Sequence, residues 1–238
     1  MGILVLFRHA QASFLEQNYD KLSELGEGQA RLLGEHWARR KIVFDRASVG
    51  PCTRQKDTLR LVSAAYDRAG LKFPKPLVLP EFDEYQAEAV LTRGLPGLLE
   101  NDQRIRGLHA AFQSSPDGKR HATFQKLFEA VIGEWVRGTI CPQGVETWLE
   151  FCCRVNSGLT KFLVAGGHGE RVAIFTSGGP IAVAMQRALH LSPESTLQMS
   201  WMSRNSSWSD FLYAEERFTL STFNAHGHID DPVMLTYR

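Results

Sequence analysis

Short apolar runs alternate with longer amphipathic segments along this chain. Residues Ile3 to Phe7 are continuously apolar, which predicts a strand buried on both faces of a mostly parallel sheet. Ser23 is followed by Glu24 and Glu27, and then by an amphipathic stretch from Ala30 to Trp37. A serine followed by acidic residues in the next turn is typical of a capped helix start, so we expect this strand to lead into a helix.

The same alternation recurs further along the chain. Gly50-Pro51 and Gly178-Gly179-Pro180 separate apolar runs from amphipathic segments, and such Gly-Pro breaks indicate turns, with Pro180 suited to the first turn of a helix. The pattern predicts strands over residues 46–49, 172–175 and 218–223, and helices over 53–68 and 181–191. Strands that alternate with helices predict an α/β fold, here a three-layer α/β/α arrangement with a mostly parallel central sheet.

Residues from about 86 to 144 interrupt this alternation. This stretch is mixed and polar, and it contains Gly94, Pro96, Gly97 and a polar turn at residues 114–118. We interpret it as a largely helical insertion that forms a lid, within one domain that spans residues 1–238. A chain of 238 residues is long enough for one large α/β domain with such an insertion.

The composition argues against several classes of protein. Hydrophobic residues make up 43% of the chain and charged residues 22%, and the net charge is +1, which does not favour a disordered or nucleic-acid-coating protein. No stretch approaches the roughly 20 apolar residues that cross a bilayer. The apolar run at the N-terminus is too short for a signal peptide and has no basic segment ahead of it. We therefore expect a cytoplasmic protein that binds neither nucleic acid nor membrane.

The cysteines and histidines give no sign of a metal or disulfide framework. The spacing of the four cysteines, Cys52, Cys141, Cys152 and Cys153, fits neither a disulfide scaffold nor a zinc site. The segment 226–230, His-Gly-His-Ile-Asp, imitates a metal-binding cluster, but it lies at the end of the chain with no later ligands, and we set it aside. We expect no metal and no cofactor. A homo-oligomer is compatible with the sequence, although no segment indicates an interface.

Three polar segments follow predicted strands. They are Arg8-His9, the segment 50–54, and Thr176-Ser177-Gly178-Gly179. Ligands of open α/β sheets bind at the carboxyl ends of the strands, so we expect these segments to form one site. Arg8 would keep the imidazole of His9 neutral and nucleophilic and would bind two oxygens of a phosphoryl group, which is the electrostatic environment that phosphoryl transfer needs.

The residues around His9 resemble the Arg-His-Gly motif of the histidine phosphatase superfamily, which includes phosphoglycerate mutases. The segment 22–30, Leu-Ser-Glu-Leu-Gly-Glu-Gly-Gln-Ala, is similar to the family's next motif, and the segment 50–58 is similar to its Ser-Pro-x-x-Arg-x-x-x-Thr motif. The resemblance implies a phosphoglycerate mutase-like fold, His9 as the catalytic nucleophile, and Arg8 and Arg54 as phosphate-binding residues.

The family's general acid is a glutamate that precedes the insertion. Aligning Phe82-Asp83-Glu84 with the family's Leu-x-Glu favours Glu84, whereas aligning Leu79-Pro80-Glu81 favours Glu81. We take Glu84 as the candidate and keep Glu81 as the alternative. The segment 144–147, with Glu146 and with Arg154 downstream, resembles the family's Gly-Glu-Ser segment, although Glu146 is equally well explained as an acidic residue in the first turn of a helix.

The sequence departs from the family at two positions. Ser177 stands where the family carries a second histidine that donates to the phosphate, and Ala10 replaces the usual glycine. Serine is a neutral donor, and the backbone amides of the helix that starts near Gly178 still favour an anion, so we expect Ser177 and Gly178 to bind phosphate. These departures bear on catalytic efficiency more than on the fold.

The resemblance and the residues together predict a phosphatase that hydrolyses a small phosphorylated metabolite through a phosphohistidine on His9, without a cofactor. Its partners would be that phosphorylated substrate or a phosphate ion. A phosphoglycerate mutase-type phosphotransferase is one alternative. The other is a catalytically weak protein that binds a phosphorylated ligand in the same pocket, which the serine at position 177 supports.

Overall fold

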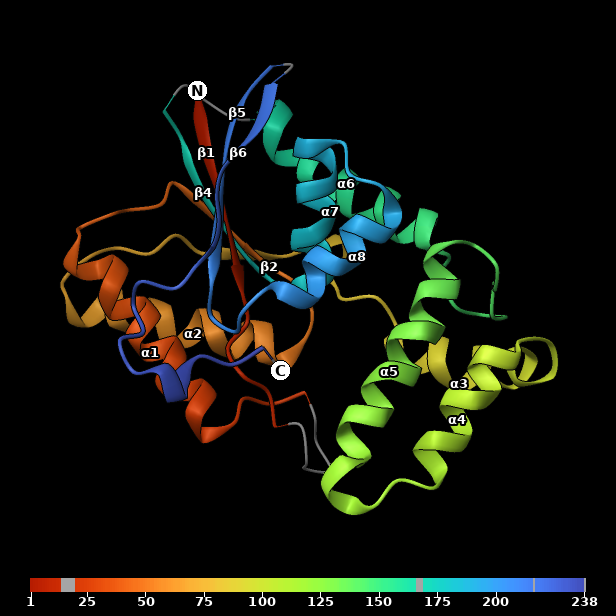
Figure 1. The fold of residues 1–238 in the computed structure, drawn as a ribbon. Coiled ribbons are helices and arrows are strands. Elements are labelled where there is room, and N and C mark those ends of the chain that lie inside the picture. The colour runs from red at the N-terminus through yellow and green to blue at the C-terminus, as the bar shows by residue number, and fades with distance from the viewer. Residues whose placement is uncertain (14–19, 166–168, 216, 238) are drawn as a thin grey trace. The chain divides into compact units, whose positions relative to one another are not determined.

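A computed structural model describes residues 1–13, 20–165, 169–215 and 217–237 (Figure 1). The chain divides into two compact units, one made of residues 1–84 and 154–238 and the other of residues 85–153. No helix among the described residues is long and apolar enough to cross a membrane.

The first unit is built on a six-stranded sheet within the described ranges. Its strands run in the order β3-β2-β4-β1-β5-β6. The strands β1 to β4 pair in parallel, whereas β5 and β6 are antiparallel to their neighbours. The bounds are Gly2–Arg8 for β1, Arg46–Val49 for β2, Pro76–Val78 for β3, Arg171–Thr176 for β4, Trp208–Ala214 for β5 and Arg217–Ala225 for β6.

Helices cover both faces of this sheet. In Figure 1, α1 (Glu24–Arg39) and α2 (Thr53–Arg68) lie on one side of the strands and α7 (Gly178–Leu189) lies on the other, beside α8 (Pro193–Met202). The remaining elements with residues in this unit are α6 (Trp148–Ala165) and two short 3-10 helices, Pro80–Phe82 and Pro232–Met234. The layers and the mostly parallel sheet agree with the predicted three-layer α/β fold.

An aromatic cluster fills the space between the sheet and the pair α1 and α2. Phe7 of β1 stacks on Phe175 of β4 with ring centroids 4.7 Å apart, and Trp37 of α1 packs edge-on against Phe7 at 5.2 Å. Residues of β1 at positions 4 to 7 are almost completely buried. Burial on both faces explains why this strand is continuously apolar in sequence.

Local sequence patterns predicted most of these helices and strands correctly. Ser23 caps α1 as expected, because its hydroxyl accepts the backbone N–H of Gly26 at 3.0 Å. The predicted start of α7 was wrong by three residues, since the helix begins at Gly178 and ends at Leu189. A Cβ atom on Gly178 would lie 2.9 Å from the carbonyl oxygen of Ser200, so this glycine permits close packing against α8 and does not form a turn. The strand β5 and the helix α8 were not predicted.

The second unit is helical. It contains α3 (Ala87–Asn101), α4 (Gln103–Gln113) and α5 (Asp117–Val136). Trp135, which is almost completely buried, stacks on Tyr85 at 5.3 Å and meets Trp148 edge-on at 5.5 Å. This aromatic cluster gives the unit a core of its own. The role of residues 86–144 as a lid stays a prediction.

Candidate active site

The carboxyl ends of three neighbouring strands meet at one edge of the sheet. The backbone N–H of His9, just after β1, donates to the carbonyl oxygen of Thr176 at the end of β4, at 2.8 Å. The backbone N–H of Gly50, just after β2, donates to the carbonyl oxygen of Phe175 at 3.0 Å. These bonds extend the parallel register beyond the strands, and they bring together the three polar segments that the sequence singled out.

The imidazole of His9 is held through both ring nitrogens. Its Nδ1 lies 2.8 Å from the carbonyl oxygen of Ala10, and a carbonyl oxygen only accepts, so Nδ1 carries the proton. Its Nε2 accepts a hydrogen bond from Nε of Arg54 at 3.2 Å. The ring is therefore a neutral imidazole whose Nε2 lone pair faces the guanidinium of Arg54.

The surroundings of His9 oppose its protonation. Burial lowers its pKa most strongly, and the positive charges of Arg54 and then Arg8 lower it further, so that the pKa lies well below its usual value of 6.5. The hydrogen bond to Ala10 acts in the opposite direction but is weaker. The sequence analysis attributed the neutral state of His9 to Arg8, whereas burial and Arg54 lower the pKa of His9 more than Arg8 does.

Arg8 lies between the end of β1 and the start of α7. Its Nη1 donates to the carbonyl oxygen of Ser203, and a Cβ atom on Gly178 would lie 3.8 Å from its Nε. The residue is only 9% exposed. Arg8 therefore places a positive charge beside the first turn of α7, where the N-terminal amides also favour an anion.

Arg54 is paired with an acidic residue that the sequence did not identify. Its Nη1 lies 2.7 Å from a carboxylate oxygen of Asp20, and the other oxygen of that carboxylate accepts the backbone N–H of Thr53 at 2.8 Å. Asp20 thus caps the first turn of α2 and contacts the arginine expected to bind phosphate. No sequence pattern indicates this contact, because the partners are 34 residues apart.

Ser177 lies at the N-cap of α7 and is completely buried. Its hydroxyl makes no capping bond to the helix; instead it accepts a hydrogen bond from Nε2 of Gln55 at 2.8 Å. Gln55 follows Arg54 directly in α2 and was also missed by sequence reasoning. The only sequence signal was its position within the arginine-containing motif.

The two candidate glutamates occupy different environments. A carboxylate oxygen of Glu84 accepts the backbone N–H of Gly179 at 3.2 Å, in the first turn of α7. Glu81 forms an ion pair with Lys161 of α6, and the hydrogen bond from this lysine is the main reason that the pKa of Glu81 is lowered. Glu84 therefore lies against the first turn of α7, whereas Glu81 is paired with a lysine of α6.

Arg154 fixes the segment that carries Glu84. Its Nη1 donates to the carbonyl oxygens of Pro80, Glu81 and Asp83, at 3.0 to 3.2 Å. The preceding helix start is capped by Glu150, whose carboxylate accepts both the backbone N–H and the hydroxyl of Thr147. Arg154 thus holds the backbone that precedes Glu84.

A comparison with protein-family models gives a match that covers the C-terminal half of this chain. The model described as histidine phosphatase superfamily (branch 1) matches residues 103–226, which is just over half of the chain. The chain belongs to the histidine phosphatase superfamily. The matched range includes Ser177 and Gly178, whereas His9, Arg54 and Glu84 precede it.

Solved structures of this superfamily's fold resemble the chain over almost its whole length. A mycobacterial glucosyl-3-phosphoglycerate phosphatase in complex with inorganic phosphate has a TM-score of 0.63 at 20% identity, covering 96% of this chain and 99% of its own. A phosphoglycerate mutase from Bacillus anthracis has a TM-score of 0.59 at 16% identity, covering 95% and 94%. A mutant phosphoserine phosphatase from Entamoeba histolytica in complex with phosphoserine has a TM-score of 0.61 at 14% identity, covering 96% and 100%.

These likenesses concern the fold, and they confirm the predicted phosphoglycerate mutase-like α/β architecture. A comparison with curated proteins gives no match. The chemistry of this member of the superfamily depends on its own site residues.

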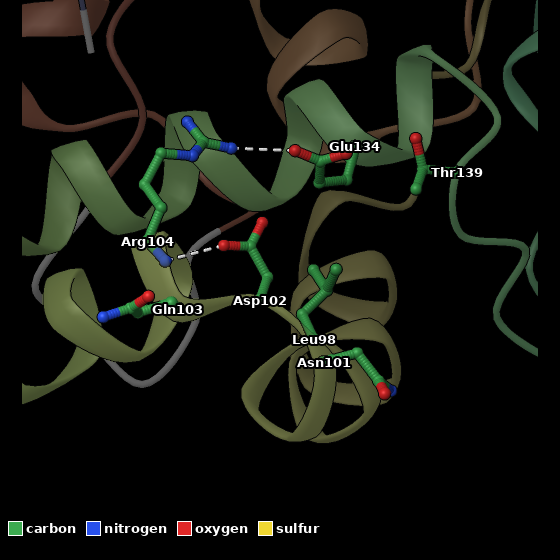
Figure 2. Close-up of a pocket in the computed structure, with 7 residues that line it drawn as sticks. All are labelled: Leu98, Asn101, Asp102, Gln103, Arg104, Glu134 and Thr139. Atoms are coloured by element: carbon green, nitrogen blue, oxygen red, sulfur yellow. Dashed lines mark hydrogen bonds and ion pairs between the residues drawn. The ribbon is translucent and has the colours of Figure 1, made fainter.

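In this histidine phosphatase superfamily member, a separate pocket of about 660 Å³ lies in the helical unit (Figure 2). Asp102 caps α4 there by accepting the backbone N–H of Arg104 at 2.7 Å, and the side chain of Arg104 pairs with Glu134 at 2.8 Å. Arg137 also pairs with Glu134, at 2.6 Å. Arg104 and Glu134 pair with each other and Asp102 is bonded to helix backbone, so the charged side chains that line this pocket are already engaged.

The histidines near the C-terminus contact polar side chains of neighbouring segments. Among the described residues, no group of three or more His, Cys, Asp or Glu side chains is arranged to hold a metal ion. His228 is buried and its Nε2 lies 2.8 Å from the hydroxyl of Ser206, whose backbone N–H donates to the carbonyl oxygen of His9. His228 therefore supports the loop behind His9.

Proposed function

We propose that this chain is a phosphatase that hydrolyses a small phosphorylated metabolite through a phosphohistidine intermediate on His9. The observation that carries the proposal is the geometry of this side chain: Nδ1 is bonded to the carbonyl of Ala10, and the lone pair of Nε2 faces the guanidinium of Arg54. A neutral imidazole beside two buried arginines is a nucleophile next to a binding site for a phosphoryl dianion.

In the first step, Nε2 of His9 attacks the phosphorus atom and the bond from phosphorus to the ester oxygen breaks. Arg8 and Arg54 bind the equatorial oxygens, where negative charge is concentrated in the transition state. Ser177 and the amides at the start of α7 contribute further donors. Glu84 gives its proton to the leaving oxygen, so the alcohol departs neutral.

In the second step, water attacks the phosphorus atom of the phosphohistidine. The Glu84 carboxylate left by the first step accepts a proton from that water, and the bond between phosphorus and Nε2 breaks. Inorganic phosphate leaves, His9 returns to its neutral form, and Glu84 is again protonated. The position of Glu84 beside Gly179, 3.2 Å from its backbone nitrogen, supports this role over Glu81, which pairs with Lys161.

The substrate class is a phosphomonoester of small size. Two structures that share the fold carry phosphate or phosphoserine, which makes phosphoserine and glucosyl-3-phosphoglycerate reasonable first members of a substrate panel. A mutase uses the same first step but returns the phosphoryl group to an organic acceptor instead of water. Release of inorganic phosphate distinguishes the two.

The proposal is tested by phosphate release from this panel, together with p-nitrophenyl phosphate, for the wild type and for His9→Ala. We expect turnover in the wild type and none in His9→Ala, and we expect an alkaline quench to trap an acid-labile phosphoryl group only on the wild type. Labelling that persists in His9→Ala contradicts the nucleophile. Oxyanion binding without turnover on the whole panel would instead favour a phospho-ligand-binding protein.

A further inference from the structure

We propose that Gln55 is a positioning residue, which orients the hydroxyl of Ser177 so that it donates its proton to a phosphoryl oxygen. This inference rests on the proposed function, because it assigns Ser177 the role of a phosphate donor. It adds Gln55 of α2 to a site that was predicted from three segments at strand ends.

The orientation of the Gln55 carboxamide is fixed by its partners. Its oxygen accepts the backbone N–H of Cys52 at 3.2 Å, and its Nε2 donates to the carbonyl oxygen of Phe82 at 3.2 Å. A backbone N–H only donates and a carbonyl oxygen only accepts, so the amide cannot be turned around. The second proton of Nε2 therefore points to the hydroxyl oxygen of Ser177, 2.8 Å away.

This bond decides what the Ser177 hydroxyl does. Because Oγ accepts from Gln55, the hydroxyl proton is left to donate in another direction. The carbonyl oxygen of Phe82 already accepts from Gln55 and from the hydroxyl of Thr176, at 2.8 Å. The hydroxyl also makes no bond to the helix that it caps. A phosphoryl oxygen, which only accepts, matches the remaining donor.

The surroundings of Gln55 are shaped around its carboxamide. The residue is completely buried. A Cβ atom on Gly50 would lie 2.2 Å from Oε1 of Gln55 and 2.5 Å from the carbonyl oxygen of Phe82, so a glycine is required there for the carboxamide to fit. A buried amide with all its partners in place holds one geometry, which is what a positioning residue requires.

The experiment is a double-mutant cycle on the full chain, with inorganic phosphate and orthovanadate as probes and calorimetry as the readout. The variants are Gln55→Leu, Ser177→Ala and the double variant, with Ser177→Thr as a background that keeps the hydroxyl. One neutral hydrogen bond corresponds to roughly a 3- to 10-fold change in affinity. We expect Gln55→Leu to weaken binding by about this factor in the wild type and in Ser177→Thr.

In the Ser177→Ala background we expect Gln55→Leu to cause no further loss, because the hydroxyl through which it acts is gone. Losses that multiply in the double variant, or an unchanged affinity in Gln55→Leu, would overturn the inference. Gln55→Met is the second variant, since methionine matches glutamine in length and adapts to irregular space. Loss of the native circular dichroism spectrum in both variants would assign Gln55 a purely structural role and would also overturn it.

The failure of this inference is distinguishable from the failure of the proposed function. A wild-type chain that binds neither phosphate nor vanadate contradicts the proposed function and this inference together. A wild-type chain that binds the probes and loses affinity when Arg54 is replaced, but shows independent effects of Gln55 and Ser177, contradicts only the role of Gln55.

Discussion

A carboxylate oxygen of Asp20 lies 2.7 Å from Nη1 of Arg54. The arginine proposed to bind phosphate is therefore held by an acidic side chain that is 39% exposed. The carboxylate orients the guanidinium, and it also lies close to where a phosphoryl dianion would bind. These two effects oppose each other, and a substitution that keeps the shape of Asp20 while removing its charge separates them.

We expect Asp20→Asn to raise the affinity for inorganic phosphate. The amide oxygen of asparagine can still accept from one of the two donors, Arg54 or the backbone N–H of Thr53, whereas the negative charge that repels the anion is gone. Ion pairs at exposed positions contribute up to about 1 kcal/mol, so the expected gain is roughly two- to fivefold. Calorimetric titration with phosphate measures it.

Two controls accompany this prediction. Asp57→Asn removes a carboxylate that pairs with Arg60 at 3.2 Å, with both residues in the same helix as Arg54, and it should leave phosphate affinity unchanged. Raising the salt concentration should shrink the difference between Asp20→Asn and the wild type, because salt screens exposed charges. A lower affinity in Asp20→Asn would mean that orientation of Arg54 outweighs repulsion.

Arg54→Ala is expected to weaken phosphate and vanadate binding. The variant removes a charge-assisted donor, which corresponds to about 1.5 to 3 kcal/mol of binding free energy. Arg54→Lys keeps a positive charge without the fork of donors and should recover only part of the loss. An unchanged affinity of Arg54→Ala for phosphate and vanadate would place this residue outside the binding pocket.

The same variant should change the titration of His9. Because Arg54 is the largest charge effect that lowers the pKa of His9, its removal should raise that pKa toward 6.5. In the wild type the imidazole should stay neutral below pH 6.5, so the enzyme should keep its activity at pH values below 6.5. NMR titration of the His9 ring protons checks both expectations, and an identical titration curve in Arg54→Ala would contradict them.

Glu84→Gln should slow the hydrolysis of phosphate esters to an extent that depends on the leaving group. Glutamine cannot give a proton to an alkoxide, so turnover of phosphoserine should fall much more than turnover of p-nitrophenyl phosphate, whose leaving group needs little protonation. Glu81→Gln is the matched control, because Glu81 pairs with Lys161. Equal losses on both esters in Glu84→Gln, together with a selective loss in Glu81→Gln, would transfer the acid role to Glu81.

His228 should make the native state sensitive to acid. Burial is the main cause that lowers its pKa to about 3, so below pH 6.5 the unfolded chain binds a proton at this residue that the folded chain does not. Stability due to this histidine is therefore present above pH 6.5 and is lost as the pH falls toward 3, at about 1.4 kcal/mol per pH unit. Urea unfolding between pH 7 and pH 4.5 measures the slope.

His228→Gln should reduce this slope and keep a side chain able to bond with Ser206. If the wild type and His228→Gln lose stability equally on acidification, His228 is protonated in the folded chain.

Features that depend on residues close together in the chain were predictable before the structure was known. The apolar run from Ile3 to Phe7 predicts a buried strand because burial on both faces leaves no polar position. Ser23 predicts a helix start because its hydroxyl reaches an amide three residues away. The Arg8-His9 pair and the Arg54 motif are contiguous as well, and strand ends of a parallel sheet converge, so their meeting at one edge was predictable.

Tertiary structure alone decided the contacts between residues far apart in the chain. Gln55 and Ser177 are 122 residues apart, and Glu84 and Gly179 are 95 apart, so no periodicity or local motif relates them. Two alignments with the family were open, one favouring Glu84 and the other Glu81, and only the packing of α6 placed Lys161 against Glu81. A hydrogen bond depends on distance and direction in space, and for such pairs both are set by how the helices pack on the sheet.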